Sequence, residues 1–172
     1  MNRRSMLTAG AVAAAVLPFA ATSARAQESA MMADGTMDPA KAPAILNGNF
    51  AKLSSQLAAQ QAQNEAVRTF AELEVAEQTA VATAFGVPAD APPAIPEDKA
   101  ALLEQLQAAQ GAAFDTAYVD AQIAGHEELR AIHSDYAQNG TDPMARGASM
   151  VGVPSIDTHL VMLNSIRASL GA

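Results

Sequence analysis

Apolar residues recur every three or four positions along most of this chain, which is the spacing of helices that bury one face. The longest such stretch runs from Phe114 to Tyr136, about six turns at 3.6 residues per turn. It also holds two of the three histidines, His126 and His133. We predict one long central helix here, and Asn139-Gly140 gives it a C-terminal cap signature. Its inward stripe comprises Phe114, Tyr118, Ala121, Gly125, Leu129, Ile132 and Tyr136.

Two apolar stripes precede a proline-rich connector in the first half of the chain. The first stripe predicts a helix over residues 45–63. The second begins after an N-cap at Asn64 and ends before Gly86. Its inward line contains Glu74, a carboxylate that is costly to bury unless it is paired. The connector, residues 88–96, carries four prolines and is expected to be stiff and extended.

The second half of the chain has one helix before the central helix and two after it. Glu97 opens the earlier helix with the negative charge that helix N-termini favour, and Gly111 interrupts it before the central helix. A short helix is predicted over residues 143–149. We expect a break at Pro154 before the last helix, whose inward face includes His159.

The sum of these stripes predicts an all-α protein. Runs of alternating β-branched or aromatic residues, which mark strands, are missing. An antiparallel four-helix bundle with short extra helices is the simplest way to bury four main stripes. Cysteine is absent, which excludes disulfides, thiol catalysis and zinc–cysteine sites.

Residues 1–26 have the pattern of a secretory signal peptide. A basic start at Arg3-Arg4 precedes an alanine-rich apolar core, and Ala24-Arg25-Ala26 is a small-residue cleavage site. The paired arginines also fit a twin-arginine export signal, and the alternative is an ordinary secretory signal. We therefore expect a periplasmic or envelope protein with a flexible leader over residues 27–44 and a helical bundle domain over residues 45–172.

Charge narrows the range of partners. Removing residues 1–26 takes away three arginines and no acid, so 7 basic and 18 acidic residues remain, a net charge of −11. This balance argues against nucleic acid as a partner. We expect no transmembrane segment after signal removal. The partner is expected to be an envelope protein or a small ligand, and the sequence identifies neither.

Three runs resemble the bacterial domain-of-unknown-function family 4142. They are VRTFAELEVAEQT at 67–79, FDTAYVDAQIAGH at 114–126 and IDTHLVML at 156–163. The resemblance implies a ferritin-like, exported four-helix bundle of the kind often labelled a putative outer membrane protein. It implies no established activity. Family members usually carry an Asp-His pair where this chain has Glu77 and Gln78, so a site built on three histidines would be incomplete here.

A metal site is the main chemical candidate. The Glu-x-x-His motif of di-iron bundles is absent before all three histidines, which argues against that centre. Instead His126, His159 and Glu74 could hold zinc, iron or copper. The alternative is structural: both histidines are hydrogen-bonded in the core or at its boundary, and Glu74 either pairs with an arginine such as Arg68 or Arg130 or lies at a wet edge. His133 is expected to be solvated.

Two classes of function follow. The first, which we favour, is a non-enzymatic envelope module that binds a partner or acts under stress. The second is a periplasmic metal-binding or redox helper that uses His126 and His159. No serine lies in a G-x-S-x-G turn, and no phosphate loop or dinucleotide turn is present, so the sequence favours a protein without catalysis. No cofactor is expected in the first class, and a transition metal ion is expected in the second.

Overall fold

The computed structural model describes residues 38–171, and these residues are all-α, as predicted. They contain helices and turns and no strand. The predicted signal peptide at 1–26 and the predicted leader up to residue 37 lie outside the described residues. The helices are α2 (Ala42–Gln61), α3 (Glu65–Ala84), α4 (Glu97–Ala108), α5 (Gly111–Asn139) and α6 (Pro143–Leu170).

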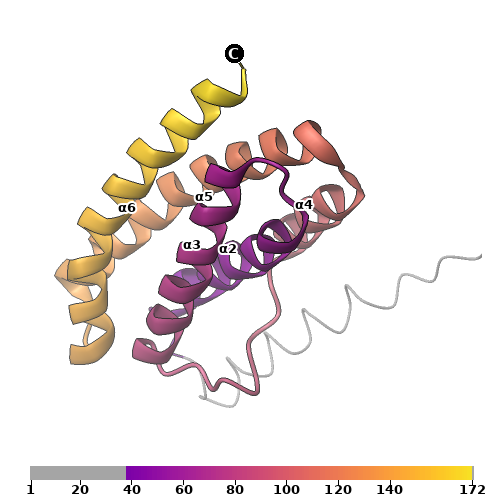
Figure 1. Cartoon of the computed structure of the whole chain (residues 1–172). Coiled ribbons are helices and arrows are strands. Elements are labelled where there is room, and N and C mark those ends of the chain that lie inside the picture. Colours follow the sequence, from indigo (N-terminus) through magenta and orange to yellow (C-terminus); the bar gives the residue numbers. More distant parts are fainter. Residues whose placement is uncertain (1–37, 172) are drawn as a thin grey trace, which may run out of the picture.

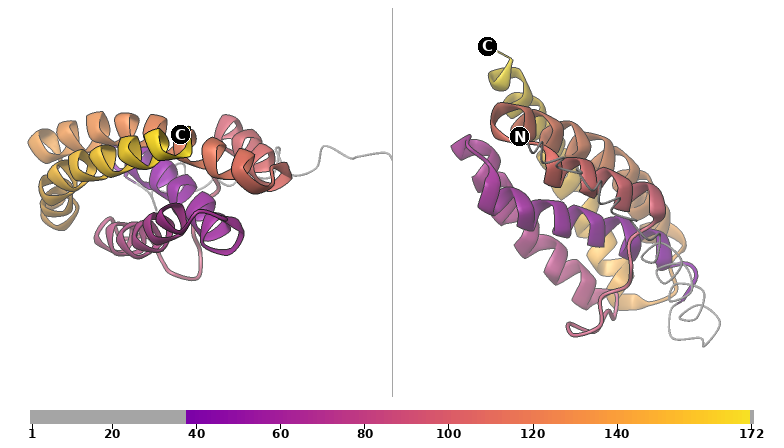
Figure 2. Two further views of the ribbon diagram at one scale, coloured as in Figure 1. Left: turned by 45° about the horizontal axis from the view of Figure 1, so that its top comes forward. Right: turned by 90° about the vertical axis from the view of Figure 1, so that its right-hand side faces the viewer.

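The four long helices form two antiparallel pairs that stack on each other (Figure 1). α2 packs on α3 across a short turn, and α5 packs on α6 in the same way. The left view of Figure 2 shows the α5–α6 pair as one layer and the α2–α3 pair as the other. α4 is shorter and contacts α2 and α5. This arrangement brings inward residues of α3, α5 and α6 together between the two layers.

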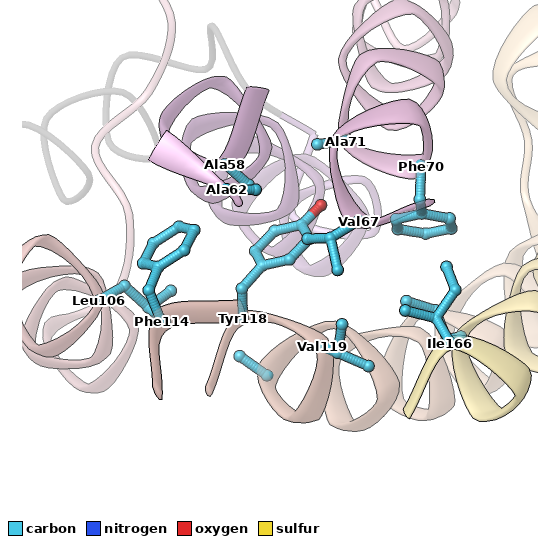
Figure 3. Packing of buried hydrophobic residues seen from close by; sticks show 12 residues of the cluster. Ala58, Ala62, Val67, Phe70, Ala71, Leu106, Phe114, Tyr118, Val119 and Ile166 are labelled. Carbon is cyan, nitrogen blue, oxygen red and sulfur yellow. The ribbon is translucent and has the colours of Figure 1, made fainter. Parts of the chain in front are cut away.

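The main apolar core fills the space between the layers. Phe114 and Tyr118 of α5 stack with ring centroids 6.2 Å apart, and Figure 3 shows Tyr118 facing the alanines of α2. Tyr118 is fully buried, and its hydroxyl satisfies its hydrogen bonding with Ser55 Oγ at 2.8 Å. Small alanines on α2, such as Ala58, allow this close approach. The predicted inward stripe of α5 is therefore confirmed as a core face.

The turn between α2 and α3 is fixed from two sides. Asn64 caps α3, since its side chain accepts hydrogen bonds from the backbone N–H groups of Ala66 and Val67, as predicted. The buried carboxylate of Asp115 on α5 accepts from the backbone N–H groups of Gln63 and Asn64 at 3.1 and 2.8 Å. Asp115 therefore ties one layer to the other beside the turn.

The predicted break at Pro154 is wrong, because α6 continues through it. A proline inside a helix removes one N–H donor and crowds the preceding turn, at a cost of about 3 kcal/mol. Packing on both sides offsets that cost, since Ser149 and Ile156 are both buried. Gly152, two residues before the proline, is also buried and lies beside the ring of His133. Helix 143–149 and the last helix are thus one element.

Among residues 38–171, no helix combines the length and apolar character needed to cross a bilayer.

Candidate metal centre

Glu74 of α3, His126 of α5 and His159 of α6 meet between the two layers of the bundle. Glu74 Oε2 is 3.4 Å from His126 Nε2 and 3.2 Å from His159 Nδ1. The two facing imidazole nitrogens are 3.2 Å apart. None of the three residues is more than 3% exposed. The structure therefore brings together all three residues that the sequence named as candidate ligands.

Phe70 forms an apolar wall beside this cluster. It lies one helical turn before Glu74 on α3, so both side chains project toward the interior. Its ring centroid is 5.8 Å from that of His126 and 5.3 Å from that of His159. Figure 3 shows the Phe70 ring pointing from α3 toward Ile166 of α6. This wall keeps water from one side of the cluster and limits the rotation of both imidazoles.

The outer nitrogen of each imidazole faces an acceptor. His126 Nδ1 lies 2.8 Å from the backbone oxygen of Gln122, so this nitrogen carries the proton. His159 Nε2 lies 3.4 Å from Glu77 Oε2, and Ser155 Oγ donates to both Glu77 carboxylate oxygens, at 2.8 and 3.0 Å. In the neutral imidazoles, the inner nitrogens therefore present lone pairs to each other and to Glu74 Oε2. Contacts of this kind orient metal-binding histidines and raise their basicity.

Three electron-pair donors this close together need a positive charge between them. Glu74 Oε2 is buried, and the two imidazole nitrogens at 3.2 and 3.4 Å are its contacts among the described residues. Burial alone would raise the pKa of Glu74, but hydrogen bonding and attraction from His126 and His159 lower it to about 2. Burial alone would lower the pKa of His159, but the carboxylates of Glu74 and Glu77 raise it above its ordinary value. The cluster therefore attracts cations, whether protons or a metal ion.

The spacing of the three ligand atoms fits a transition metal. Nitrogen and oxygen ligands bind zinc at roughly 2.0–2.2 Å, so two ligands of a tetrahedral site lie about 3.3–3.6 Å apart. The observed separations are 3.2, 3.2 and 3.4 Å. Imidazole with carboxylate suits zinc, iron and copper. Three protein ligands would leave a coordination position open.

Gln78 holds the other oxygen of Glu74. Its Nε2 donates to Glu74 Oε1 at 2.9 Å, one helical turn further along α3. Gly48 of α2 provides the room for this amide, because a Cβ at position 48 would lie 2.7 Å from Gln78 Oε1. With Oε1 held in this way, Oε2 is directed at the imidazoles.

The profile of one protein family matches most of the chain. The match covers residues 21–166, and the family is described as a domain of unknown function, DUF4142. The chain belongs to this family. No curated protein and no solved structure matches the chain. Membership in DUF4142 therefore confirms the resemblance in the sequence and leaves the activity to be argued from the site.

Glu77 and Gln78 occupy the positions at which the resemblance to DUF4142 implied an Asp-His pair. Both residues contact the cluster: Glu77 supports His159, and Gln78 supports Glu74. Neither residue was expected to take part in the site. Their spacing from Glu74 was the available signal, since residues three and four positions apart share one face of a helix.

The expected arginine partner of Glu74 is wrong. Arg130 pairs with Asp157 on the surface, and Arg68 donates to the backbone oxygens of Ala62 and Gln63. The partner of Arg130 lies on the neighbouring helix α6, and the partners of Arg68 lie in the turn before α3, so neither arginine reaches Glu74. The two histidines are thus the charge partners of Glu74.

The expected exposure of His133 is also wrong, because the side chain is only 2% exposed. Its Nδ1 lies 3.0 Å from Ser149 Oγ of α6, and its ring meets Phe85 edge-on at 5.6 Å. Burial lowers the pKa of His133 to about 4. His133 is therefore a neutral core histidine, separate from the cluster of Glu74, His126 and His159.

His133 is expected to make the fold sensitive to acid. The unfolded chain takes up a proton at this residue near pH 6.5, whereas the folded protein does so only near pH 4. The contribution of His133 to the free energy of unfolding is therefore fully present above pH 6.5. It falls by up to about 3 kcal/mol as the pH is lowered to 4. Urea unfolding of the wild type and His133→Gln between these pH values should give a flatter dependence for the variant. Parallel curves would contradict this assignment.

Proposed function

We propose that this protein binds a transition metal ion through Glu74, His126 and His159. The observation that carries the proposal is the convergence of three buried electron-pair donors at 3.2–3.4 Å, with both outer imidazole nitrogens already facing acceptors. A protonated imidazole would supply the same positive charge, so direct metal binding is what distinguishes an ion from a proton at this position. When bound, such an ion supplies Lewis acidity at its open coordination position.

We also propose that the fold is a ferritin-like four-helix bundle that works in the periplasm or envelope. The two antiparallel pairs α2–α3 and α5–α6 support the bundle, and the ligands come from three of these helices. The Arg3-Arg4 start and the Ala24-Arg25-Ala26 cleavage site support export. Mass measurement of the processed protein tests export, and a chain that retains residues 1–26 would contradict it.

Direct metal binding is the decisive test of the site. Purified protein freed of metal by a chelator should take up one zinc ion per chain in a calorimetric titration. His126→Ala and His159→Ala each remove one of three ligands, so we expect each to weaken zinc binding by at least about 100-fold. Elemental analysis of the protein as isolated should identify the natural ion.

His133→Gln is the matched control, because His133 is an equally buried histidine of the same helix that lies outside the cluster. We expect it to bind zinc like the wild type. The proposal would be overturned if the wild type did not bind zinc, or if His133→Gln lost zinc binding to the same extent as the two ligand variants. Binding of a protein partner, the class that the sequence favoured, stays a prediction.

A further inference from the structure

Glu74 turns one carboxylate oxygen toward the two imidazoles and the other oxygen away from them. Oε2 lies 3.4 Å from His126 Nε2 and 3.2 Å from His159 Nδ1. Oε1 accepts a hydrogen bond from Gln78 Nε2 at 2.9 Å instead. An ionised carboxylate can only accept hydrogen bonds, so the amide must present its nitrogen to Oε1 and its oxygen to the opposite side. One oxygen of Glu74 is therefore already engaged within the protein.

The amide of Gln78 is held between Glu74 and helix α2. Gln78 is 6% exposed, and its Oε1 lies so close to Gly48 that an added Cβ there would be 2.7 Å away. The hollow beside these residues, which Val81 also lines, has about 20 Å³, room for about one water molecule. The amide has little space in which to turn, and its hydrogen bond to Glu74 is a fixed part of the fold.

This hydrogen bond limits the number of ligand atoms that the cluster offers to an ion. Two imidazole nitrogens and one carboxylate oxygen leave one open position in a tetrahedral site, which is the usual coordination of zinc in proteins. Manganese is found in octahedral sites rich in oxygen ligands. Zinc binds more tightly than manganese to most sets of ligands, and proteins adjust this preference through geometry and ligand type. A carboxylate that gave both oxygens would favour the higher coordination number.

We propose that Gln78 and Gly48 determine the metal specificity of this centre, by keeping Glu74 a one-oxygen ligand and thereby favouring tetrahedral zinc over octahedral manganese. This inference rests on the metal function proposed above and adds the kind of ion that the site prefers. Gln78 acts through Glu74 and is a positioning residue. Without the amide, Glu74 Oε1 would be a buried acceptor with no donor among residues 38–171, a costly state that is relieved when this oxygen turns toward the ion.

Gln78→Leu tests the role of the amide, because leucine is similar in size to glutamine and cannot donate a hydrogen bond. Calorimetric titration of metal-free protein with zinc and with manganese gives the two Kd values and their ratio. We expect the preference for zinc over manganese to fall at least about 10-fold, since loss of such a partner weakens zinc binding by this amount while manganese gains a second oxygen. A variant that only loosened the packing would weaken both ions alike and leave the ratio unchanged.

Gly48→Ala reaches the same amide from α2. Alanine favours helix more than glycine does, and its Cβ meets only the end of a flexible side chain, so the variant should fold. We expect it to lower the preference for zinc in the same direction. It should have no further effect when combined with Gln78→Leu, which lacks the atom that the Cβ meets. Gly147→Ala is the matched control, since an added Cβ at this glycine of α6 has nothing within 4 Å.

Cobalt(II) bound to the wild type gives a readout that needs no variant. Tetrahedral cobalt absorbs visible light far more strongly than octahedral cobalt, so we expect intense bands in the wild type and weaker bands in Gln78→Leu. Weak bands in the wild type, or an unchanged ratio of Kd values in Gln78→Leu, would overturn this inference and leave the proposed metal function standing, provided that the wild type binds zinc. A wild type that bound no metal ion would overturn both.

Discussion

Replacing Phe70 with alanine is expected to lower the free energy of unfolding by about 3–5 kcal/mol. Phe70 is 1% exposed and belongs to the main apolar cluster between the two layers. Its removal leaves a cavity that the helices can fill only in part, because α3 and α6 are held apart by their other neighbours. Urea denaturation of the two proteins at one pH measures the effect.

Leu73→Ala is the control for this prediction. Leu73 lies on the same helix and has a similar size, but it is 43% exposed. We expect it to cost less than about 1 kcal/mol. The same Phe70→Ala protein should also bind zinc more weakly, since the ring restrains both imidazoles of the centre. Equal losses of stability in the two variants would contradict the placement of Phe70 in the core.

Saturating zinc is expected to stabilise the protein strongly. A free zinc concentration of about 1,000 times Kd adds about 4 kcal/mol to the free energy of unfolding. For a domain of this size, that is a rise in Tm of roughly 10–20 °C. Glu74→Gln keeps the shape of the side chain and removes its charge, so the rise should disappear. Thermal unfolding with and without zinc measures both values.

Glu77→Gln should give an intermediate result. Glu77 faces the outer nitrogen of His159 and is placed to orient the imidazole without binding the ion itself. Loss of such a partner weakens metal binding by about 10–100-fold, so the stabilisation at the same zinc concentration should fall by roughly 1.4–2.7 kcal/mol. A full rise in Tm in Glu74→Gln, or none in the wild type, would contradict the metal centre.

The helices could be predicted from the sequence because their signals are local. The spacing of Phe114 and Tyr118 showed the inward face of α5, and Asn64 marked the start of α3. The continuity of α6 could not be predicted, because the effect of Pro154 depends on how tightly the residues around it are packed. Burial of the residues around Pro154 is a property of the folded chain, and the helix propensities of single residues do not report it.

The three candidate ligands were named from the sequence, yet their meeting in the fold could not be derived from it. Periodicity placed Glu74 and His159 on inward faces, and it left open the relative rotation and height of α3, α5 and α6. His133 illustrates the same difficulty, because its position near the end of α5 indicated exposure while α6 covers it with Ser149. Side chains that meet across layers are determined by packing between helices, which has no short-range signal in the chain.

The candidate ligands come from α3, α5 and α6, and even His126 and His159, on consecutive helices, are separated by 33 residues. The site therefore exists only after the two layers have docked, and an extended chain presents isolated imidazoles of low affinity. The compartment in which folding finishes would then decide which ion is loaded. A chain exported in its folded state would carry an ion taken from the cytoplasm, whereas a chain that folds after export would select among the ions outside.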